Sequence, residues 1–443
     1  MSRAPAARTK AGRLTPARTA AGRLTSARTA TGRGTLARTA AGRGTAARVV
    51  GRLCAGLALA AAALLGTAAP ATAHGADAPN GTDYRSAVTG LAPARPGLSV
   101  RVVEAGARLE LRNDTDRTVT VLGYSGEPYL QVRPDGVYEN TRSPATYLNR
   151  TLAGETTVPA EADPTAEPAW QRIADRPVAR WHDQRALWRE SAPPPQVTAA
   201  PDREHRVRGW VVPLRDGDTP VELRGTLDWV PPPDAYLWWV AVALGALAVS
   251  GLGLVPAGRA AGGRALAVLG GLLATGGLAA VAVAVGRALD AGAQGPGELL
   301  GGLLTGQLWA LITGLGAVAA GAWAVARRAA ADFALALAGA CLALFAGVTN
   351  AAVLARSVPP LPWPATPARL VVTLILLVGA GAVLAGVFRL HAESRATASR
   401  ATPNPGSPAT GHAESPATAP IEGPAGTAAA PDGRAGGSVS GGR

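Results

Sequence analysis

The chain has few of the residues that stabilise small exported domains or bind soft metals. Its 443 residues include two cysteines, one methionine, three phenylalanines and five histidines. Cys54 precedes a hydrophobic run near the start and Cys341 lies inside a later one, so the region between them has no disulfide. That region also lacks methionine, which disfavours Cu(I) chemistry because thiolate and thioether ligands select that ion.

Acidic residues are missing from residues 1–52, which hold twelve of the 43 Lys and Arg side chains. The formal net charge is +13, but residues 74–233 carry 19 Arg against 22 Asp and Glu. A nucleic-acid-binding protein needs a basic patch with stacking aromatics on a folded surface, and the sequence shows none. It also shows no nucleophile–base pair, phosphate loop, paired carboxylates or zinc-ligand spacing, so we expect no enzyme activity.

A decapeptide repeat of the type ARTAAGRLTS fills the beginning of the chain. It has no apolar periodicity and ten basic residues by Arg43, so we expect residues 1–47 to be disordered. Two interpretations stay open. The repeat is either a basic arm for acidic lipid or nucleic acid, or a tandem expansion upstream of a true start near Val49 or Val50.

Residues 48–73 have the three parts of a signal peptide. Two arginines precede the run LCAGLALAAAALLG, which is too short to span a bilayer comfortably, and the small residues TAAPATA follow. We predict cleavage after Ala71 or Ala73. The second cut makes His74 the new N-terminus.

Residues 74–234 are predicted to form an exported all-β domain, an immunoglobulin-like sandwich. LSVRVV, ARLELR, TVTVLGY and YLQV are β-branched or alternating runs with turn signals between them. VRGWVVPL and VELRGTLDWV flank RDGDTP as a hairpin. The region contains no Phe, so its core depends on tryptophan and tyrosine. Alternation predicts two inward leucines and three outward charged residues, namely Leu109, Leu111, Arg108, Glu110 and Arg112.

Five hydrophobic runs follow in residues 235–389 and predict an α-helical transmembrane bundle. The predicted spans are 235–255, 265–285, 303–326, 333–354 and 370–388. No ionisable residue lies in the core of a span, which weighs against a pump or a proton-coupled transporter. The strongest polar groups of spans three and four either line a small pocket or form interhelical hydrogen bonds. They are Thr305, Gln307, Thr349 and Asn350.

Arginines follow the first, third and fifth spans, whereas the other loops carry mixed charge and proline. The positive-inside rule therefore predicts a multi-pass plasma-membrane protein with an extracytoplasmic β-domain and a cytoplasmic C-terminus. An odd number of spans after a cleaved signal requires the same orientation. Residues 390–443, rich in Ala, Pro, Gly, Ser and Thr, are expected to be a disordered cytoplasmic tail.

Three histidines fall in the predicted exported region: His74, His182 and His205. An amino-terminal histidine chelates through its amine and a ring nitrogen, and a second imidazole would complete a histidine brace suited to Cu(II). His182 in ARWHDQRALW or His205 in DREHRVRGW is the candidate second imidazole. The alternative for His74 is an ordinary residue in a flexible start.

The alternative for His182 is a half-buried ring hydrogen-bonded in a tryptophan-rich cluster. Trp181 and Trp188 flank it, and Asp183 would pair with Arg185 or Arg180.

The order of signal peptide, β-domain with RWHDQRALW and GTLDWVPPP, and five-span bundle resembles a group of actinobacterial membrane proteins over roughly residues 74–390. Genes of this group often lie near those for CopC-type copper-resistance proteins, so the resemblance implies copper or other metal handling at the cell envelope. Relatives carry His or Met at the positions of Gln184, Leu187 and Arg189, where this chain has none.

We therefore expect a membrane-anchored extracytoplasmic binding or accessory protein, with Cu(II) as the implied metal and an envelope protein as the candidate partner. Two other interpretations stay open: a subunit of a small-solute transporter, and a membrane scaffold for protein interactions.

Overall fold

The computed structural model describes residues 80–401, with side chains to residue 396. The decapeptide repeat, the signal peptide and His74 lie outside the described residues, as does most of the predicted tail.

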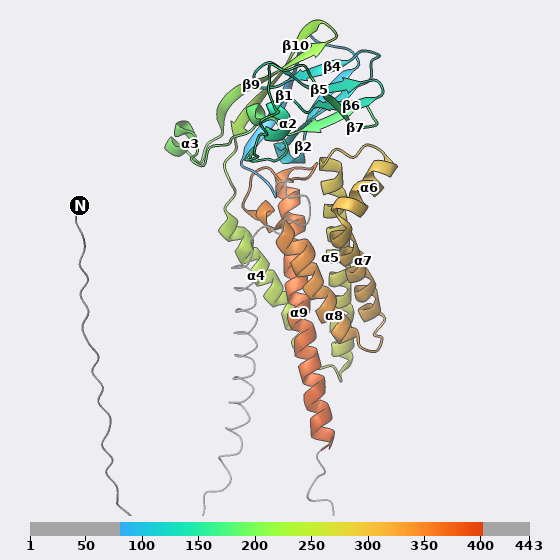
Figure 1. Ribbon diagram of the computed structural model, residues 1–443. Coiled ribbons are helices and arrows are strands. Elements are labelled where there is room, and N and C mark those ends of the chain that lie inside the picture. Colours follow the sequence, from blue (N-terminus) through green and yellow to red (C-terminus); the bar gives the residue numbers. More distant parts are fainter. Residues whose placement is uncertain (1–79, 402–443) are drawn as a thin grey trace, which may run out of the picture. The chain divides into compact units, whose positions relative to one another are not determined.

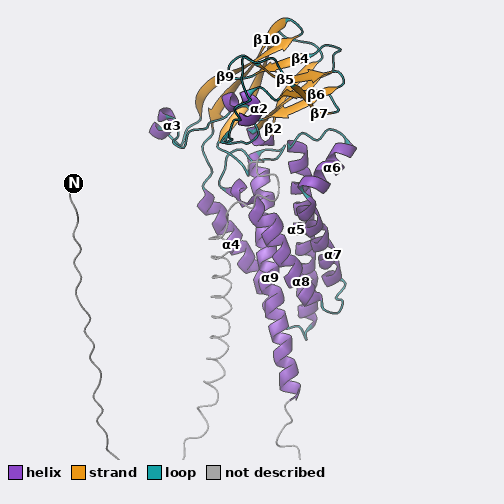
Figure 2. Cartoon of the chain, viewed as in Figure 1, coloured by secondary structure: helices purple, strands orange, loops and turns teal. Residues whose placement is uncertain are grey.

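Two antiparallel sheets confirm the predicted β-sandwich. The larger sheet has the strand order β1-β10-β9-β4-β5-β6-β7, and the smaller has the order β2-β3-β8. Figure 1 labels these strands, and Figure 2 separates them from the helices by colour. The strands are β1 (Tyr84–Ala92), β2 (Leu98–Val103), β3 (Arg108–Asn113), β4 (Val119–Leu122), β5 (Pro128–Arg133), β6 (Gly136–Asn140), β7 (Trp170–Ala174), β8 (Val178–Trp181), β9 (His205–Asp216) and β10 (Thr219–Trp229).

β9 and β10 form the predicted hairpin around a short turn. Gly217 in this turn has a φ of 59°, a left-handed conformation that glycine adopts without a steric penalty. The register pairs Tyr84 with Trp229, and Trp229 with His205, so these three residues form one row across three neighbouring strands.

Inward side chains of the two sheets form the core of the β-domain. Leu109 and Leu111 are 1% and 0% exposed, as the alternation predicts. Tryptophans supply much of the remaining bulk, and Trp181 and Trp210 are both buried. Gly225 lies opposite Trp210 in the strand register, and a Cβ at Gly225 would collide with the indole ring. The absence of a side chain there lets the ring lie across the neighbouring strand.

The described residues contain five helices long and apolar enough to cross a membrane. The first and fourth agree with the predicted bounds to within two residues. The second and fifth are longer than predicted, and the third begins at Leu308 after a break at Gln307. The five candidate spans are Ala235–Leu254, Ala260–Asp290, Leu308–Val325, Ala331–Leu354 and Ala365–Ala396.

Helix labels follow the chain order in Figure 1. α4 (Ala235–Gly251), α5 (Ala260–Asp290), α7 (Leu308–Val325), α8 (Ala331–Cys341) and α9 (Ala365–Ala401) provide the spans, and α6 (Pro296–Gly306) precedes the third. The fourth span continues from α8 through a π-helical segment, Leu342–Gly347, and a 3₁₀ segment, Val348–Leu354. The β-domain also carries two short helices, α2 (Pro144–Leu148) and α3 (Pro195–Ala199).

Glycine pairs bring α5 and α7 into backbone contact. A Cβ at Gly277 would lie 2.5 Å from the carbonyl oxygen of Gly314, and Gly270 and Gly321 approach each other in the same way. Small residues allow this close packing in a bundle whose helices gain little from the hydrophobic effect within lipid.

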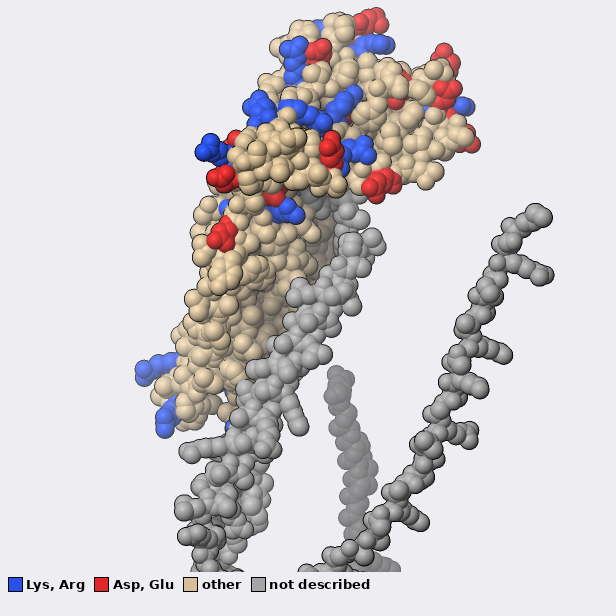
Figure 3. Space-filling view, turned by 90° about the vertical axis from the view of Figure 1, so that its left-hand side faces the viewer, with Lys and Arg blue, Asp and Glu red and all other residues tan. Residues whose placement is uncertain are grey.

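The arginine-rich loops meet at one end of the bundle. Arg389 Nη1 donates to the carbonyl oxygen of Gly262 (3.4 Å) and pairs with Asp332, and Gly263 lies beside Arg327. Figure 3 shows arginine side chains at that end, below a stretch of helical surface that has no charged groups on the face drawn. The helices therefore present an apolar belt of the kind that a bilayer covers.

Candidate functional site

The segment RWHDQRALW folds as the end of β8 followed by a 3₁₀ turn, Gln184–Ala186. Asp183 caps this turn: its buried carboxylate accepts hydrogen bonds from the Arg185 backbone N–H (3.0 Å) and from the Arg185 side-chain atoms Nε and Nη2 (2.8 Å each). The indole N–H of Trp181 donates to the same carboxylate (3.0 Å). Asp183 therefore pairs with Arg185, one of its two expected partners, and organises the segment.

His182 is buried, at 1% exposed, and both of its ring nitrogens have partners. Nδ1 lies 2.8 Å from the carbonyl oxygen of Ala107, and Nε2 lies 3.1 Å from Arg108 Nε. A carbonyl only accepts and a guanidinium only donates, so the ring is the neutral tautomer with its proton on Nδ1. A cationic side chain occupies the position where Nε2 would bind a metal. This arrangement of His182 does not fit a metal site.

His205, at the start of β9, fits better. Its Nε2 donates to the carbonyl oxygen of Ala200 (2.6 Å), which leaves the lone pair on Nδ1. His74 lies outside the described residues. Between residues 80 and 396, no group of three His, Cys, Asp or Glu side chains is placed to hold a metal ion. The histidine brace therefore stays a prediction, with His205 as its better-placed second imidazole.

Trp188 joins this segment to the larger sheet. Its ring stacks on Tyr84 at a centroid separation of 5.9 Å, and the Arg208 guanidinium lies 6.0 Å from the ring. Its indole N–H donates to the carbonyl oxygen of Ala192 (3.0 Å). These contacts fix one wall of an adjacent pocket.

The pocket has a volume of about 370 Å³ and opens beside the 3₁₀ turn. Burial, followed by the negative charge of Asp183, raises the pKa of Tyr124 to about 12. The Tyr124 hydroxyl therefore stays protonated, donates to Asn149, and accepts from the Gln184 backbone N–H (3.0 Å). Two aromatic rings, three arginines and one amide contribute to the lining: Tyr124, Trp188, Arg185, Arg189, Arg208 and Gln184.

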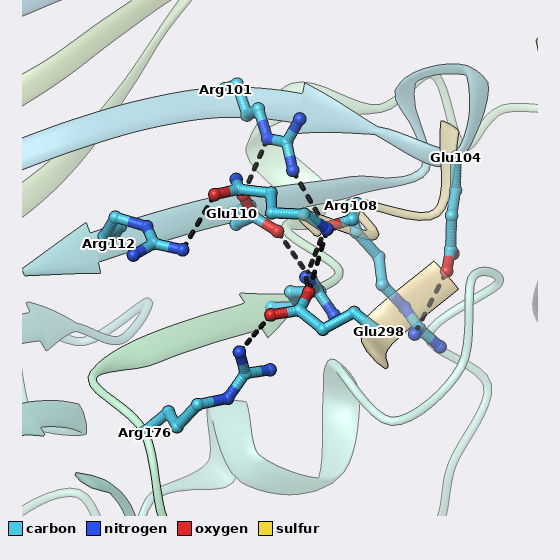
Figure 4. Close-up of polar contacts among 10 residues, drawn as sticks. Arg101, Glu104, Arg108, Glu110, Arg112, Arg176 and Glu298 are labelled. Carbon is cyan, nitrogen blue, oxygen red and sulfur yellow. Dashed lines mark hydrogen bonds and ion pairs between the residues drawn. The ribbon is translucent and has the colours of Figure 1, made fainter. Parts of the chain in front are cut away.

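Glu110 points away from the core, as the alternation predicts. It is nevertheless only 2% exposed, because residues 291–295, between the second span and α6, cover it. Its carboxylate accepts from Arg101 Nε (2.6 Å), Arg180 Nε (2.6 Å) and Gln294 Nε2 (3.2 Å). Figure 4 shows Arg101 and Glu110 on neighbouring strands, with Glu298 and Arg176 nearby.

The covering loop closes over Glu110 with a backbone carbonyl. The carbonyl oxygen of Gly292 accepts from Arg101 Nη2 (3.0 Å) and Arg180 Nη2 (2.7 Å). Gly292 has a φ of 94°, and a Cβ there would lie 2.6 Å from the Glu110 carboxylate, so the position requires glycine. Burial alone would raise the pKa of Glu110, but the hydrogen bonds from Arg101 and Arg180 outweigh it and lower that pKa.

Further contacts extend this interface. We call the Glu110 cluster and these further contacts the docking contacts. Glu298 at the start of α6 pairs with Arg176, and this hydrogen bond lowers the pKa of Glu298. Arg112 Nη2 donates to Gln294 Oε1 (2.7 Å), and the Ala105 backbone N–H donates to Asp290 Oδ2 (2.9 Å).

The loop between the fourth and fifth spans makes the second half of the docking contacts. Arg356 pairs with Asp83, and the Ser357 backbone N–H donates to the same carboxylate (3.0 Å). Thr82 and Val358 exchange two backbone hydrogen bonds (3.0 and 2.8 Å) as an isolated antiparallel bridge. The β-domain is thus attached to two loops of the bundle as well as through its own chain connection.

No protein-family model, curated protein or solved structure matches the chain. The geometry itself defines the class: an antiparallel β-sandwich attached by ion pairs and backbone hydrogen bonds to the loops of a five-helix bundle suited to a membrane. The Glu110 cluster was not among the predicted sites. Its signal in the sequence is the mixed charge of Arg287, Asp290 and Glu298, at the end of α5 and the start of α6, together with the alternating arginines of β2 and β3.

Proposed function

We propose that this protein is a membrane-anchored binding or accessory protein of the cell envelope, with its β-domain on the extracytoplasmic side. The observation that carries the proposal is the burial of Glu110 between two arginines and the Gly292 carbonyl. One face of the β-domain is thereby fixed to the bundle, while the pocket beside Trp188 stays open. A fixed face and an open pocket suit a binding domain held at a membrane surface.

The charge distribution supports this orientation. Arginines follow the first and third spans, and at the same end of the bundle Arg389 pairs with Asp332 and Arg327 lies beside Gly263. At the opposite loops, Asp290, Glu298 and Arg356 each have a partner in the β-domain. An excess of Lys and Arg marks cytoplasmic loops, so the β-domain belongs outside.

A chain of contacts connects the pocket segment with the bundle. From His182 it passes through Arg108 (3.1 Å) to Glu104 (3.4 Å), at a turn where Glu104 and Ala105 have φ values of 55° and 53°. This turn presents the Ala105 N–H to Asp290 at the end of α5.

Within the bundle the contacts continue into the fourth span. Arg287, one turn before Asp290 in α5, donates to Asn350 Oδ1 (2.9 Å). Asn350 lies in the 3₁₀ segment directly after the π-helical segment, a local geometry often found at functional positions. A ligand that shifts the pocket segment therefore has a physical route to the bundle.

The polar groups of spans three and four favour an accessory role over transport. The hydroxyls of Thr305 and Thr349 are exposed and donate to carbonyl oxygens one turn earlier in their own helices (2.8 Å each). Asn350 is buried and is engaged by Arg287 and the Ala346 carbonyl. The side chains of these three residues are therefore hydrogen-bonded to groups of the bundle itself.

Cysteine labelling tests the proposed orientation. In a background with Cys54 and Cys341 replaced by alanine, Ser125→Cys should react with an impermeant maleimide in intact cells. Ser399→Cys should react only after permeabilisation. Reaction of Ser399→Cys but not Ser125→Cys in intact cells would overturn the proposal.

Metal handling is a second candidate function, favoured by the position of His205. The Nε2 atom of His205 donates to the carbonyl oxygen of Ala200 (2.6 Å), so the Nδ1 lone pair stays open for a metal ion.

Cu(II) titration tests this second function with the mature chain in detergent. The chain that begins at His74 should bind Cu(II) more tightly than the same chain with one extra residue ahead of His74, because the brace uses the terminal amine. His205→Ala should weaken binding as much as that extension does, while His182→Ala should not. Equal binding by the authentic and extended chains would exclude the brace.

A further inference from the structure

The pocket beside Trp188 contains two arginines, Arg189 and Arg208, that form no ion pair with a carboxylate of the described residues. Arg185 is paired with Asp183, but Arg208 donates only to the carbonyl oxygens of Leu187 and Gln184, and Arg189 donates to that of Ala153 (3.2 Å). Among the described residues, no carboxylate lies within 4.0 Å of the Arg208 or Arg189 side-chain nitrogens. Both side chains are exposed and border the same pocket.

The walls between these arginines are aromatic and apolar. Trp188 is held in place by its stacking on Tyr84, and Tyr124 lies under the Arg185 guanidinium at 4.9 Å. Leu148 adds an aliphatic side. A flat aromatic ligand would stack on these rings, and a carboxylate at its edge would accept paired hydrogen bonds from the guanidinium groups through its two oxygens.

Gln184 adds a hydrogen-bond acceptor that has no partner. Its Nε2 donates to the carbonyl oxygens of Leu148 and Thr151 (3.4 Å each), which orients the amide. Oε1 is then the acceptor, and it is buried without a hydrogen bond, although the residue is 8% exposed. Oε1 is covered in this arrangement, but both Nε2 hydrogen bonds are long, so a rotation of the amide that brings Oε1 to a ligand N–H or O–H would relieve the cost of an unpaired buried acceptor.

We propose that this pocket binds a small aromatic carboxylate that carries a hydrogen-bond donor. A volume of about 370 Å³ suits a ligand of one or two rings, since ligand pockets begin near 300 Å³. Glu190 also borders the pocket and disfavours a second negative charge, so the ligand is a monoanion. This inference rests on the proposed function and names the ligand class of its open pocket.

Calorimetric titration of the mature chain in detergent with 4-hydroxybenzoate tests the inference. We expect saturable binding that is at least about tenfold tighter than binding of the uncharged methyl ester, because the arginines contact the carboxylate. Benzoate, which lacks the donor, should also bind more weakly. Gln184→Met should remove the preference for 4-hydroxybenzoate over benzoate.

Matched arginine variants provide the control. Arg208→Gln should weaken 4-hydroxybenzoate binding at least about tenfold, which is the loss of one charge-assisted contact. Arg215→Gln removes the same charge from an exposed position of β9 outside the pocket and should leave binding unchanged.

The inference is overturned if 4-hydroxybenzoate does not bind at millimolar concentration, if the methyl ester binds as tightly, or if both arginine variants weaken binding equally. None of these results alters the cysteine labelling. An extracytoplasmic Ser125→Cys combined with no binding would therefore refute the ligand class alone, while a cytoplasmic Ser125→Cys would refute the proposed function.

Discussion

Replacing Glu110 with glutamine should destabilise the attachment between the β-domain and the bundle. The variant keeps the shape of the side chain but leaves Arg101 without a carboxylate and Arg180 with only the Glu298 carboxylate, 3.9 Å away. Removing one partner of a fully buried ion pair costs roughly 3–5 kcal/mol. We expect about 2–3 kcal/mol here, because the two arginine side chains are 43% and 30% exposed and water screens them in part.

Thermal unfolding of the full chain in detergent measures this effect. For a domain of 150–250 residues, each kcal/mol lowers the midpoint by about 2–4 °C, so Glu110→Gln should lower it by about 4–12 °C. Glu222→Gln is the matched control, since it removes a carboxylate from an exposed pair with Arg224 and should leave the midpoint unchanged.

The pH dependence gives an independent check. The pKa of Glu110 is lower in the folded protein than in the unfolded chain, where it is about 4.3. Its stabilisation is therefore fully present above that value and is lost as the pH falls through the folded pKa. The difference in stability between the original protein and Glu110→Gln should shrink below about pH 4 and stay constant from pH 6 to 8.

A combined variant distinguishes docking from a local effect within the sheet. Gly292→Ala alone should also destabilise the protein, because its Cβ would enter the space of the Glu110 carboxylate. The double variant should be less destabilised than the sum of the two single variants, since both disrupt the same contact. Additive effects, or equal midpoints for Glu110→Gln and Glu222→Gln, would refute this reasoning.

Two further changes test the bundle and the core. Asp332→Leu should destabilise the bundle by about 3–5 kcal/mol, because it removes the carboxylate that pairs with buried Arg389. Asp332→Leu combined with Arg389→Met should recover most of that loss. Thermal unfolding in detergent would show both effects, and a double variant as unstable as the single one would contradict them. Gly225→Ala should cost about 1–3 kcal/mol by forcing the Trp210 ring to move, and Trp210→Leu should relieve that cost in a denaturation series. Equal costs of Gly225→Ala in both backgrounds would contradict the clash.

Elements with strong hydrophobic patterns could be predicted from the sequence. β2, β3 and the β9–β10 hairpin have alternation or turn residues of their own, and each span is an apolar run long enough to cross a bilayer. β1, with the sequence YRSAVTGLA, was not predicted, because its small and polar residues become a strand only by pairing with β10. β6, β7 and β8 were missed for the same reason: their pairing partners, more than their composition, determine them.

The site depends still more on contacts between distant residues. Alternation correctly directs Glu110 away from the core, but no periodicity reveals that residues 291–295 cover it. The sequence around His182 is compatible with a metal ligand or with a buried ring, and only the positions of Ala107 and Arg108 distinguish the two. The helix break at Gln307 could not be predicted either, because no proline lies there to interrupt the helix.

The bridge between Thr82 and Val358 allows the most direct test of the central claim, that the β-domain is docked on the bundle outside the cytoplasm. Residues that exchange both backbone hydrogen bonds lie about 5.5 Å apart between their Cα atoms, a separation that suits a disulfide. In a background without Cys54 and Cys341, the pair Thr82→Cys and Val358→Cys should therefore form a disulfide in cells without added oxidant, since disulfides persist outside the cytoplasm. The control pair Ser125→Cys and Val358→Cys should stay unlinked. Two free thiols in the Thr82→Cys, Val358→Cys protein would contradict the account.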